Sequence, residues 1–326
     1  KNKNMSVLIF AETSEGRFKK ISFEATSYAA KVAEMLQTNL VALSINASEP
    51  SQLSDYGASK ILNVKNARLD NFNAKAYADA IKQAAEAEGA TVVVIDSSSN
   101  GLFLAPLAAY NLKAGLGSNT VALPVSVAPF VVKRTAFSNK AFCQTELTTS
   151  VKVIGLAKNA FGVFENKVEA TVEAFNPSLN DADFNIVSKE INKTSGKVSI
   201  ADADIVVSGG RGLKGPENWG MLEELAEVLG AATACSKPVA DLDWRPHNEH
   251  VGQTGKPVAA NLYIAIGISG AIQHLAGINA SKVKVVINTD PEAPFFKAAD
   301  YGIVGDAFEV VPQLVEKLKA FKQNNA

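Results

Sequence analysis

Two glycine-containing segments in the second half of the chain have the residue types of an anion-binding site. Val251-Gly252-Gln253-Thr254-Gly255-Lys256 leads through the apolar run from Leu262 to Ile266 into Gly267-Ile268-Ser269-Gly270, which we expect to open a helix continuing to His274. Backbone amides in the first turn of a helix have no intrahelical partner and can bind phosphate or another electron-rich group. The pattern therefore predicts an anion-binding turn.

A third glycine-rich segment, Ser208 to Gly215, follows the expected strand Ile205-Val206-Val207. Its glycines Gly210, Gly212 and Gly215 satisfy G-x-G-x-x-G, which alone would suggest an NAD(P)-dependent dehydrogenase. Pro216-Glu217-Asn218 intervenes before the helix, however, and the acidic residue expected about 20 positions on is missing. We favour a loop whose Arg211 binds a pyrophosphate, because guanidinium binds phosphate oxygens in a bidentate way. A simple tight turn remains the alternative.

Other polar residues stand where expected strands of this half end. Ser236 and Lys237 follow a small-residue strand from Ala232, Asn288 ends the run from Val283, and Asp306 follows Gly302-Ile303-Val304. Ligands of open α/β sheets bind at the carboxyl edge of the strands. We therefore expect these side chains to converge on one edge.

Three further chemistries have little support. Gly267 to Ala271 resembles a nucleophile elbow, but a hydrolase needs a later histidine and the nearest is His274 on the same helix. His247 and His250 have metal-like spacing without a clear third ligand, so we expect them to be solvated or hydrogen-bonded and predict no metal. Gly255-Lys256-Pro257 lacks the leading glycine and the Ser or Thr of a Walker loop.

The elements that must position these residues alternate between strands and helices. In the first half, helical spacing after a possible cap at Ser27 predicts a helix that includes Leu36. The other expected elements are strands at 7–10, 40–45, 61–64 and 91–95 and helices at 52–56, 74–87 and about 101–111. Runs that are apolar on both faces are typical of parallel strands covered by helices. The fold class is thus α/β, with a doubly wound parallel sheet.

The pattern changes between Val121 and about Val187, where strands dominate. We expect an antiparallel extension of the first sheet there, followed by a hinge from Ser188 to Lys197. Alternation then resumes, with a helix from Trp219 to Leu229 and a last helix from about Val311. The prediction is two doubly wound parallel-sheet domains: residues 1–190, an N-terminal α/β domain, and residues 198–326, a Rossmann-like ligand-binding domain.

Composition limits the classes of function. The chain has 326 residues, 47% of them hydrophobic, and a formal charge of -1, which argues against nucleic acid as the main partner. Cys143 and Cys235 are far apart, so neither a disulfide framework nor a zinc site is indicated and a reducing compartment fits best. No apolar run is long enough to span a membrane and Lys1-Asn2-Lys3-Asn4 does not resemble a signal peptide, so we expect a cytoplasmic protein that is not membrane-embedded.

Five ordered blocks of sequence resemble the alpha (large) subunit of the electron-transfer flavoprotein. The blocks are Ser208 to Gly212, Val251 to Lys256, Ile268 to Gly277, Asn288 to Pro294 and Ala299 to Val304. The resemblance spans the chain but is loose in the first half. It implies a heterodimer in which the C-terminal domain of this subunit binds FAD and a beta subunit carries AMP. Residues 1–190 would then be the scaffold that pairs with the beta subunit. The resemblance further implies an electron carrier, rather than an enzyme that converts a substrate, which accepts electrons from dehydrogenases such as the acyl-CoA dehydrogenases of fatty acid beta-oxidation and passes them to a quinone oxidoreductase.

The resemblance also implies roles for individual residues. Arg211 and Ser236 would face the FAD phosphate and ribityl side, Thr254 would lie near flavin N5 beside Gln253, and His274 would be directed at flavin O2. Lys237, Thr254 and His274 would tune the flavin. The full set implied to bind the cofactor is Arg211, Ser236, Lys237, Val251, Gly252, Gln253, Thr254, Ser269, Gly270, Ala271, Ile272, Gln273, His274, Ala307 and, at the adenosine end, Asn288 and Asp306.

One residue departs from the family pattern. The family usually has Arg after the serine at Ser236, whereas this chain has Lys237. Lysine is a compact point charge that cannot fork or stack like guanidinium, so the flavin contact is expected to be looser. The sequence leaves open the electron donor and acceptor, whether the complex bifurcates electrons, and the alternatives of an NAD(P)-dependent dehydrogenase or a regulatory nucleotide-binding module.

Overall fold

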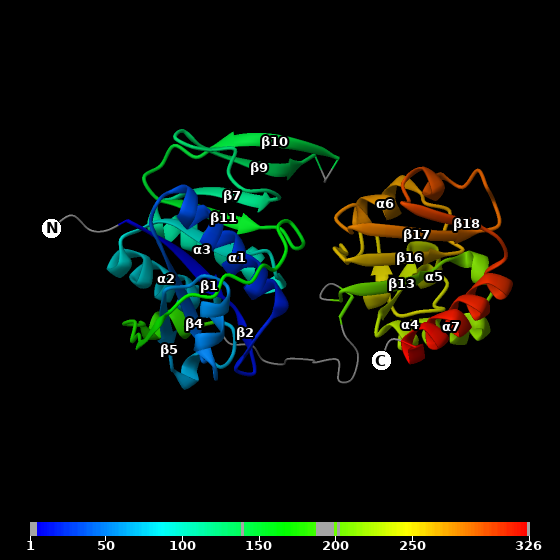
Figure 1. Cartoon of the computed structure of the whole chain (residues 1–326), viewed down its shortest axis with the longest axis horizontal. Helices are drawn as coiled ribbons and strands as arrows, with labels where there is room; N and C mark the ends of the chain where they lie inside the picture. The colour runs from blue at the N-terminus through cyan, green and yellow to red at the C-terminus, as the bar shows by residue number, and fades with distance from the viewer. Residues whose placement is uncertain (1–4, 138–139, 187–198, 201–202, 325–326) are drawn as a thin grey trace. The chain divides into compact units, whose positions relative to one another are not determined.

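The computed structural model describes residues 5–137, 140–186, 199–200 and 203–324. The chain divides into two compact units, Lys1–Ile191 (unit 1) and Asn192–Ala326 (unit 2), as Figure 1 shows. The hinge expected from Ser188 to Lys197 lies outside the described residues. None of the described helices is long and apolar enough to cross a membrane.

The described part of unit 1 is built on a ten-stranded sheet in the order β10-β9-β7-β11-β6-β1-β4-β5-β12, with β8 attached to β9. Its parallel strands are β1 (Ser6–Ala11), β4 (Asn39–Ile45), β5 (Lys60–Val64), β6 (Ala90–Asp96), β7 (Gly115–Thr120), β11 (Lys152–Leu156) and β12 (Thr171–Ala174). Every residue of β1 is buried, as expected of a parallel strand covered on both faces.

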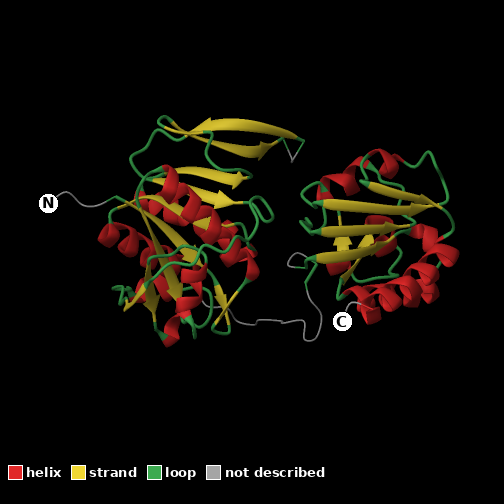
Figure 2. Cartoon of the chain, in the orientation of Figure 1, coloured by secondary structure: helices red, strands yellow, loops and turns green. Residues whose placement is uncertain are grey.

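Helices cover both faces of this sheet (Figure 2). α1 (Lys20–Met35) contributes Tyr28 and Val32 to the core on one face, whereas α2 (Ala74–Glu88) and α3 (Ser99–Leu112) pack on the other. Ser27, the expected N-cap, lies inside α1 instead and bonds back to the carbonyl oxygen of Phe23. The short helix expected at 52–56 is a 3₁₀ turn, Pro50–Asp55. Two more 3₁₀ turns are Ala67–Leu69 and Asp181–Phe184.

The antiparallel extension is smaller than the sequence predicts. β9 (Phe130–Ala136) pairs antiparallel with β10 (Ala141–Glu146) and β8 (Ser126–Val127), and a separate hairpin joins β2 (Thr13–Ser14) to β3 (Arg17–Phe18). The prediction was wrong for β11 and β12, which pair parallel with β6 and β5. β11 inserts into the centre of the sheet because its core residues are apolar on both faces and can be buried there.

The described part of unit 2 has a six-stranded, fully parallel sheet in the order β15-β14-β13-β16-β17-β18. Its strands are β13 (Ile205–Gly209), β14 (Ala232–Ser236), β15 (His250–Val251), β16 (Leu262–Ile266), β17 (Val283–Asn288) and β18 (Tyr301–Val304). Its helices are α4 (Gly220–Leu229), α5 (Lys237–Asp241), α6 (Ile272–Ile278) and α7 (Ala307–Asn324), with 3₁₀ turns at Arg211–Leu213, Pro216–Trp219, His247–Glu249 and Pro294–Lys297.

The strand order of unit 2 reverses at β13. The chain leaves β13 for β14 on one side and later returns to β16 on the other. The chain continues from β13 to β14 on one side and from β16 to β17 on the other, and open α/β sheets form a ligand crevice at the carboxyl ends of strands where the order reverses in this way. The fold class predicted from the sequence, two α/β units with parallel sheets, is confirmed.

Candidate functional site

A pocket of about 560 Å³ lies at this crevice in unit 2, within the size range of small-molecule and cofactor sites. Its wall is formed by the ends of the parallel strands and the loops that follow them. The lining residues are Arg211, Gly212, Ser236, Lys237, Pro238, His250, Val251, Gly252, Gln253, Thr254, Gly267, Ile268, Ser269, Ala271, Gln273, His274, Asn288, Asp290 and Ala293.

The loops after β13 and β16 are joined through their backbones. Gly210 donates its N–H to the Ile266 carbonyl oxygen at 2.8 Å, and Gly212 donates to the Gly267 carbonyl oxygen at 3.1 Å. A Cβ atom on Gly210 would lie 2.1 Å from that Gly267 oxygen, so a larger residue cannot take its place. The glycines of this loop serve close packing, and the two amides are already occupied.

The two hydrogen bonds between these loops argue against the alternative of an NAD(P)-dependent dehydrogenase. In the G-x-G-x-x-G fingerprint the loop backbone approaches the pyrophosphate and the third glycine packs within a helix. Here Gly210 and Gly212 use their N–H groups inside the protein, and α4 begins only at Gly220, after the 3₁₀ turn Pro216–Trp219. The geometry is that of an Arg211-bearing turn rather than of the NAD fingerprint.

The segment from β15 to α6 forms the facing wall. Gln253 donates its N–H to the Gln273 carbonyl oxygen at 2.8 Å, which ties the 251–256 loop to the first turn of α6. Behind this contact, a Cβ on Gly277 would lie 2.6 Å from the Gly252 Cα, so α6 rests directly on the loop backbone. α6 begins at Ile272, later than the helix start expected at Ser269-Gly270.

His274, from α6, is 6% exposed and lines the pocket. Its Nε2 lies 3.0 Å from the hydroxyl oxygen of Tyr263, and its ring packs against Tyr263 and Phe295. Burial lowers the pKa of His274 to about 4, so the ring is neutral at physiological pH. Its Nδ1 is buried and has no hydrogen-bond partner of good geometry among the described residues.

The charges of the lining favour an anionic ligand. Arg211 and Lys237 are exposed cations of the wall, and Asp290 is an exposed carboxylate on it. His250 and His274 add no charge near pH 7, since burial lowers the pKa of both rings. An anionic group bound between the two cations would be stabilised by charge-assisted hydrogen bonds.

The structure brings most of the sequence-predicted site residues together. Twelve of them line the pocket: Arg211, Ser236, Lys237, Val251, Gly252, Gln253, Thr254, Ser269, Ala271, Gln273, His274 and Asn288. Gly270, Ile272, Asp306 and Ala307 are not among the lining residues. Gly270 has φ +84° where the chain turns against Phe295, and Asp306 accepts the N–H of Phe308 at the start of α7.

Seven lining residues are outside the set that the sequence predicted to bind the cofactor: Gly212, Pro238, His250, Gly267, Ile268, Asp290 and Ala293. Gly212, Gly267 and Ile268 nevertheless lie in the glycine-containing segments that the sequence had indicated as anion-binding. His250 was expected to be solvated or hydrogen-bonded in a polar loop, but it is 7% exposed and belongs to β15, which pairs with β14. Its position directly before Val251-Gly252, a predicted part of the site, could have indicated that His250 also lines the pocket. Among the described residues, no three His, Cys, Asp or Glu side chains meet as metal ligands.

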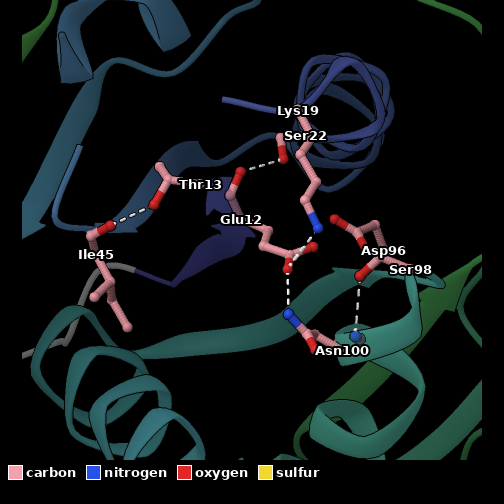
Figure 3. Close-up of polar contacts among 9 residues, drawn as sticks. Glu12, Thr13, Lys19, Ser22, Ile45, Asp96, Ser98 and Asn100 are labelled. Carbon is pink, nitrogen blue, oxygen red and sulfur yellow. Dashed lines mark hydrogen bonds and ion pairs between the residues drawn. The ribbon is translucent and has the colours of Figure 1, made fainter. Parts of the chain in front are cut away.

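A second polar cluster lies at the carboxyl ends of β1 and β6 in unit 1 (Figure 3). Oε1 of Glu12 contacts Lys19 Nζ at 2.8 Å and accepts a hydrogen bond from Asn100 at 2.6 Å, and Ser98 donates its N–H to Oδ1 of Asp96 at 2.8 Å. Burial raises the pKa of Asp96 to about 6. Glu12 and Asp96 are both buried, and Glu12 Oε2 and Asp96 Oδ2 have no hydrogen-bond partner of good geometry among the described residues. The pocket of unit 2 is the better candidate for a ligand site, because it combines a volume of about 560 Å³ with two cations on its lining.

The chain matches known proteins along nearly its whole length. A family model described as "Electron transfer flavoprotein FAD-binding domain" matches residues 199–279, and one described as "Electron transfer flavoprotein domain" matches residues 7–180. The electron transfer flavoprotein subunit alpha of Bacillus subtilis is 37% identical over 96% of this chain and 97% of its own.

Two further relatives carry the same subunit name. That of Syntrophomonas wolfei is 35% identical over 95% of this chain and 98% of its own, and the mitochondrial protein of Oryza sativa is 34% identical over 96% and 90%. Among solved structures, the UDP-GlcNAc 2-epimerase of Methanocaldococcus jannaschii is 12% identical, covering 95% of this chain and 92% of its own, with a TM-score of only 0.35. From the family models and the curated relatives, this chain belongs to the electron transfer flavoprotein family, as an alpha subunit.

Proposed function

We propose that the chain holds FAD in the pocket of unit 2 and relays electrons without converting a substrate. The observation that carries this proposal is the coincidence of two independent findings. The largest part of the pocket lining falls between Arg211 and His274, inside the segment 199–279 that matches an FAD-binding domain. That lining stands at the strand ends where open parallel sheets bind dinucleotides.

The residues present fit such a cofactor. Two cations on the lining, Arg211 and Lys237, can bind the anionic groups of the cofactor. Ile268 and Ala293 add apolar surface to the same lining. The buried, unpaired Nδ1 of His274 is the strongest sign, since a polar atom left without a partner costs about 1–3 kcal/mol. A carbonyl oxygen of a bound ring would satisfy it. When bound, FAD supplies the one-electron chemistry that amino-acid side chains lack.

Within this proposal each part of the wall has a task. Arg211 and Ser236 bind the phosphate and ribityl side, Gln253 and Thr254 border the flavin ring, and Asn288 shapes the adenosine end. Asn288 is already oriented, because its amide donates to the Ile268 carbonyl oxygen at 3.1 Å. Asp306, outside the lining, lies 3.7 Å from Lys214, the residue that ends the Arg211 turn, so we assign it to holding that turn.

Lys237 and His274 would adjust the affinity of the flavin for an electron. A cation or an N–H donor beside N1 and O2 of a bound flavin would stabilise the negative charge that reduction adds there. Lys237 can act as a cation, whereas the neutral ring of His274 can act only as a hydrogen-bond donor or acceptor. In this proposal Lys237 stabilises the reduced flavin by its positive charge, whereas His274 acts through a directed hydrogen bond.

We further propose that the chain pairs with a beta subunit carrying AMP. The name shared by its relatives, subunit alpha, supports a second subunit. Unit 1, whose sheet lies outside the FAD-binding segment, would supply the pairing scaffold. Donors would be dehydrogenases such as the acyl-CoA dehydrogenases of fatty acid beta-oxidation, and the acceptor a quinone oxidoreductase. Both cysteines are free, which fits a cytoplasmic complex.

The test is to co-express the chain with its partner subunit and to record the visible spectrum of the purified complex. We expect flavin absorbance that is bleached by a donor dehydrogenase with its substrate and restored by a quinone acceptor. A complex that stays colourless after incubation with excess FAD would refute the proposal. A complex that is colourless but binds NAD(P)H would support the dehydrogenase alternative instead.

A further inference from the structure

Tyr263 lies one layer behind the pocket wall and reaches His274 from a different element. It belongs to β16, the strand whose following loop lines the pocket, and its side chain is fully buried. The Tyr263 hydroxyl lies 3.0 Å from Nε2 of His274, which is on α6. The bond therefore couples a rigid central strand to a side chain of the pocket.

The imidazole is also held by packing on two sides. Its ring centroid is 6.1 Å from that of Tyr263 at an interplanar angle of 56°, and 6.0 Å from that of Phe295 at 53°. Phe295 is fixed in turn, because its N–H donates to the Ser269 carbonyl oxygen at 3.0 Å. These contacts restrict the ring to a narrow range of orientations. Which of its two nitrogens carries the proton therefore depends on the protein groups that face each nitrogen.

The protonation states decide which way the hydrogen bond runs. Burial raises the pKa of Tyr263, so its hydroxyl keeps its proton and needs an acceptor. The ring of His274 is neutral and offers one acceptor nitrogen and one N–H. If the Tyr263 hydroxyl donates to Nε2, the single N–H of the neutral ring must be on Nδ1.

Ser208 does not alter that direction. Its buried hydroxyl forms no hydrogen bond of good geometry among the described residues, whereas the Tyr263 hydroxyl lies 3.0 Å from Nε2 of His274. If Nε2 donated to the tyrosine instead, the tyrosine proton would have no acceptor of good geometry among the described residues.

We propose that Tyr263 is a positioning residue that donates its hydroxyl proton to Nε2 and so fixes His274 as the tautomer with its proton on Nδ1. The N–H of Nδ1 is then the group that the site offers to an acceptor oxygen of its ligand. Only this last step rests on the proposed FAD-binding function. The tautomer itself is a property of the chain's own residues.

The groups that surround His274 favour a neutral ring. His250, from β15, opposes its protonation, and His250 is itself influenced by Asp241 and Lys237 of α5. Tyr263 and Phe295 supply no charge. Removing the Tyr263 hydroxyl deletes a donor that stabilises the neutral form, so the pKa of His274 is expected to rise in Tyr263→Phe.

The test uses the complex of the full chain with its partner subunit, labelled with ¹⁵N-histidine. The chain has three histidines, and the His274 signal is assigned by its loss in His274→Gln. In the unsubstituted protein we expect the neutral ring with the proton on Nδ1 throughout about pH 5 to 8. In Tyr263→Phe we expect a mixture of tautomers, a higher pKa and FAD binding weakened about five-fold.

A matched control is Tyr28→Phe, which removes another buried hydroxyl, one that donates to the Ala122 carbonyl oxygen in unit 1. It should leave the His274 signals and FAD binding unchanged. A proton on Nε2 in the unsubstituted protein would overturn the inference without any variant, as would unaltered His274 signals in Tyr263→Phe. The expected tautomer in a complex that never binds FAD would refute the proposed function alone.

Discussion

Gly212 donates its backbone N–H to the carbonyl oxygen of Gly267 over 3.1 Å, which joins the loop after β13 to the loop after β16. These loops come from the two strands at which the sheet of unit 2 reverses its order. Their contact sets the base of the pocket, because both Gly212 and Gly267 are lining residues. The pocket therefore depends on backbone approach as much as on side-chain chemistry.

Gly210→Ala tests that approach. The added Cβ would lie 2.1 Å from the Gly267 carbonyl oxygen, a backbone atom that cannot move without shifting the loop. We expect the unfolding free energy of unit 2 to fall by about 3 kcal/mol, as in an overpacked core, and FAD to be lost from the complex. Chemical denaturation and flavin absorbance report the two effects.

Gly220→Ala is the control for that substitution. Nothing lies within 4 Å of a Cβ at Gly220, the first residue of α4. Since alanine favours helix over glycine, stability should be unchanged or slightly higher, by less than about 1 kcal/mol. Equal losses in both variants would mean that the contact between the loops is unimportant.

Arg211→Ala should weaken FAD binding. Arg211 is an exposed cation on the lining, and a hydrogen bond to a charged group contributes about 1.5–3 kcal/mol. The dissociation constant measured by fluorescence titration of the FAD-free complex is thus expected to rise by ten-fold to one-hundred-fold, roughly. Lys256→Ala, which removes an exposed cation outside the lining, should change it little. Equal effects would indicate general electrostatic attraction rather than a specific contact.

Lys237→Ala should lower the one-electron reduction potential of the bound flavin. A unit charge about 4 Å away contributes about 4 kcal/mol at an effective dielectric of 20, but Lys237 is exposed and solvent screens it. A fall on the order of tens of millivolts is expected in a potentiometric titration. Lys237→Arg keeps the charge and should retain the potential. No change in the alanine variant would place the lysine away from the flavin ring.

Asp96→Asn should stabilise unit 1 near neutral pH. The pKa of Asp96 is raised from 3.8 to about 6, so between these values the folded state holds a proton that the unfolded chain releases. Stability contributed by Asp96 consequently falls as pH rises from about 4 to about 6 and stays low above that range. Removing the charge should raise the unfolding free energy near pH 7 by up to about 3 kcal/mol.

Urea denaturation from about pH 4 to 8 follows the effect, which should vanish at the acid end. Asp181→Asn is the control, because this carboxylate of unit 1 is 96% exposed and pairs only at the surface with Arg68. A loss of stability in Asp96→Asn near neutral pH would show that its contacts outweigh the burial of its charge.

The sequence by itself determined the alternation of strands and helices and most of the pocket wall. Runs such as Val92 to Ile95 are apolar at every position, so they predict buried parallel strands without further information. Ser236 and Asn288 come at the ends of such strands, and parallel strands place their carboxyl ends at one edge. That rule brought these two residues, at opposite sides of the sheet, into one predicted site.

Only the tertiary structure decided where the short and ambiguous segments go. Gly115–Thr120 has low strand propensity and pairs as β7 because β9 and β11 flank it, and β11 enters the sheet beside β6, a strand far away in sequence. His250 and the contact between Tyr263 and His274 likewise depend on strand order and burial. A local sequence pattern indicates whether a segment favours a strand or a helix. Which strands pair, which side chains are buried and how their pKa values shift depend on residues that are distant in the chain.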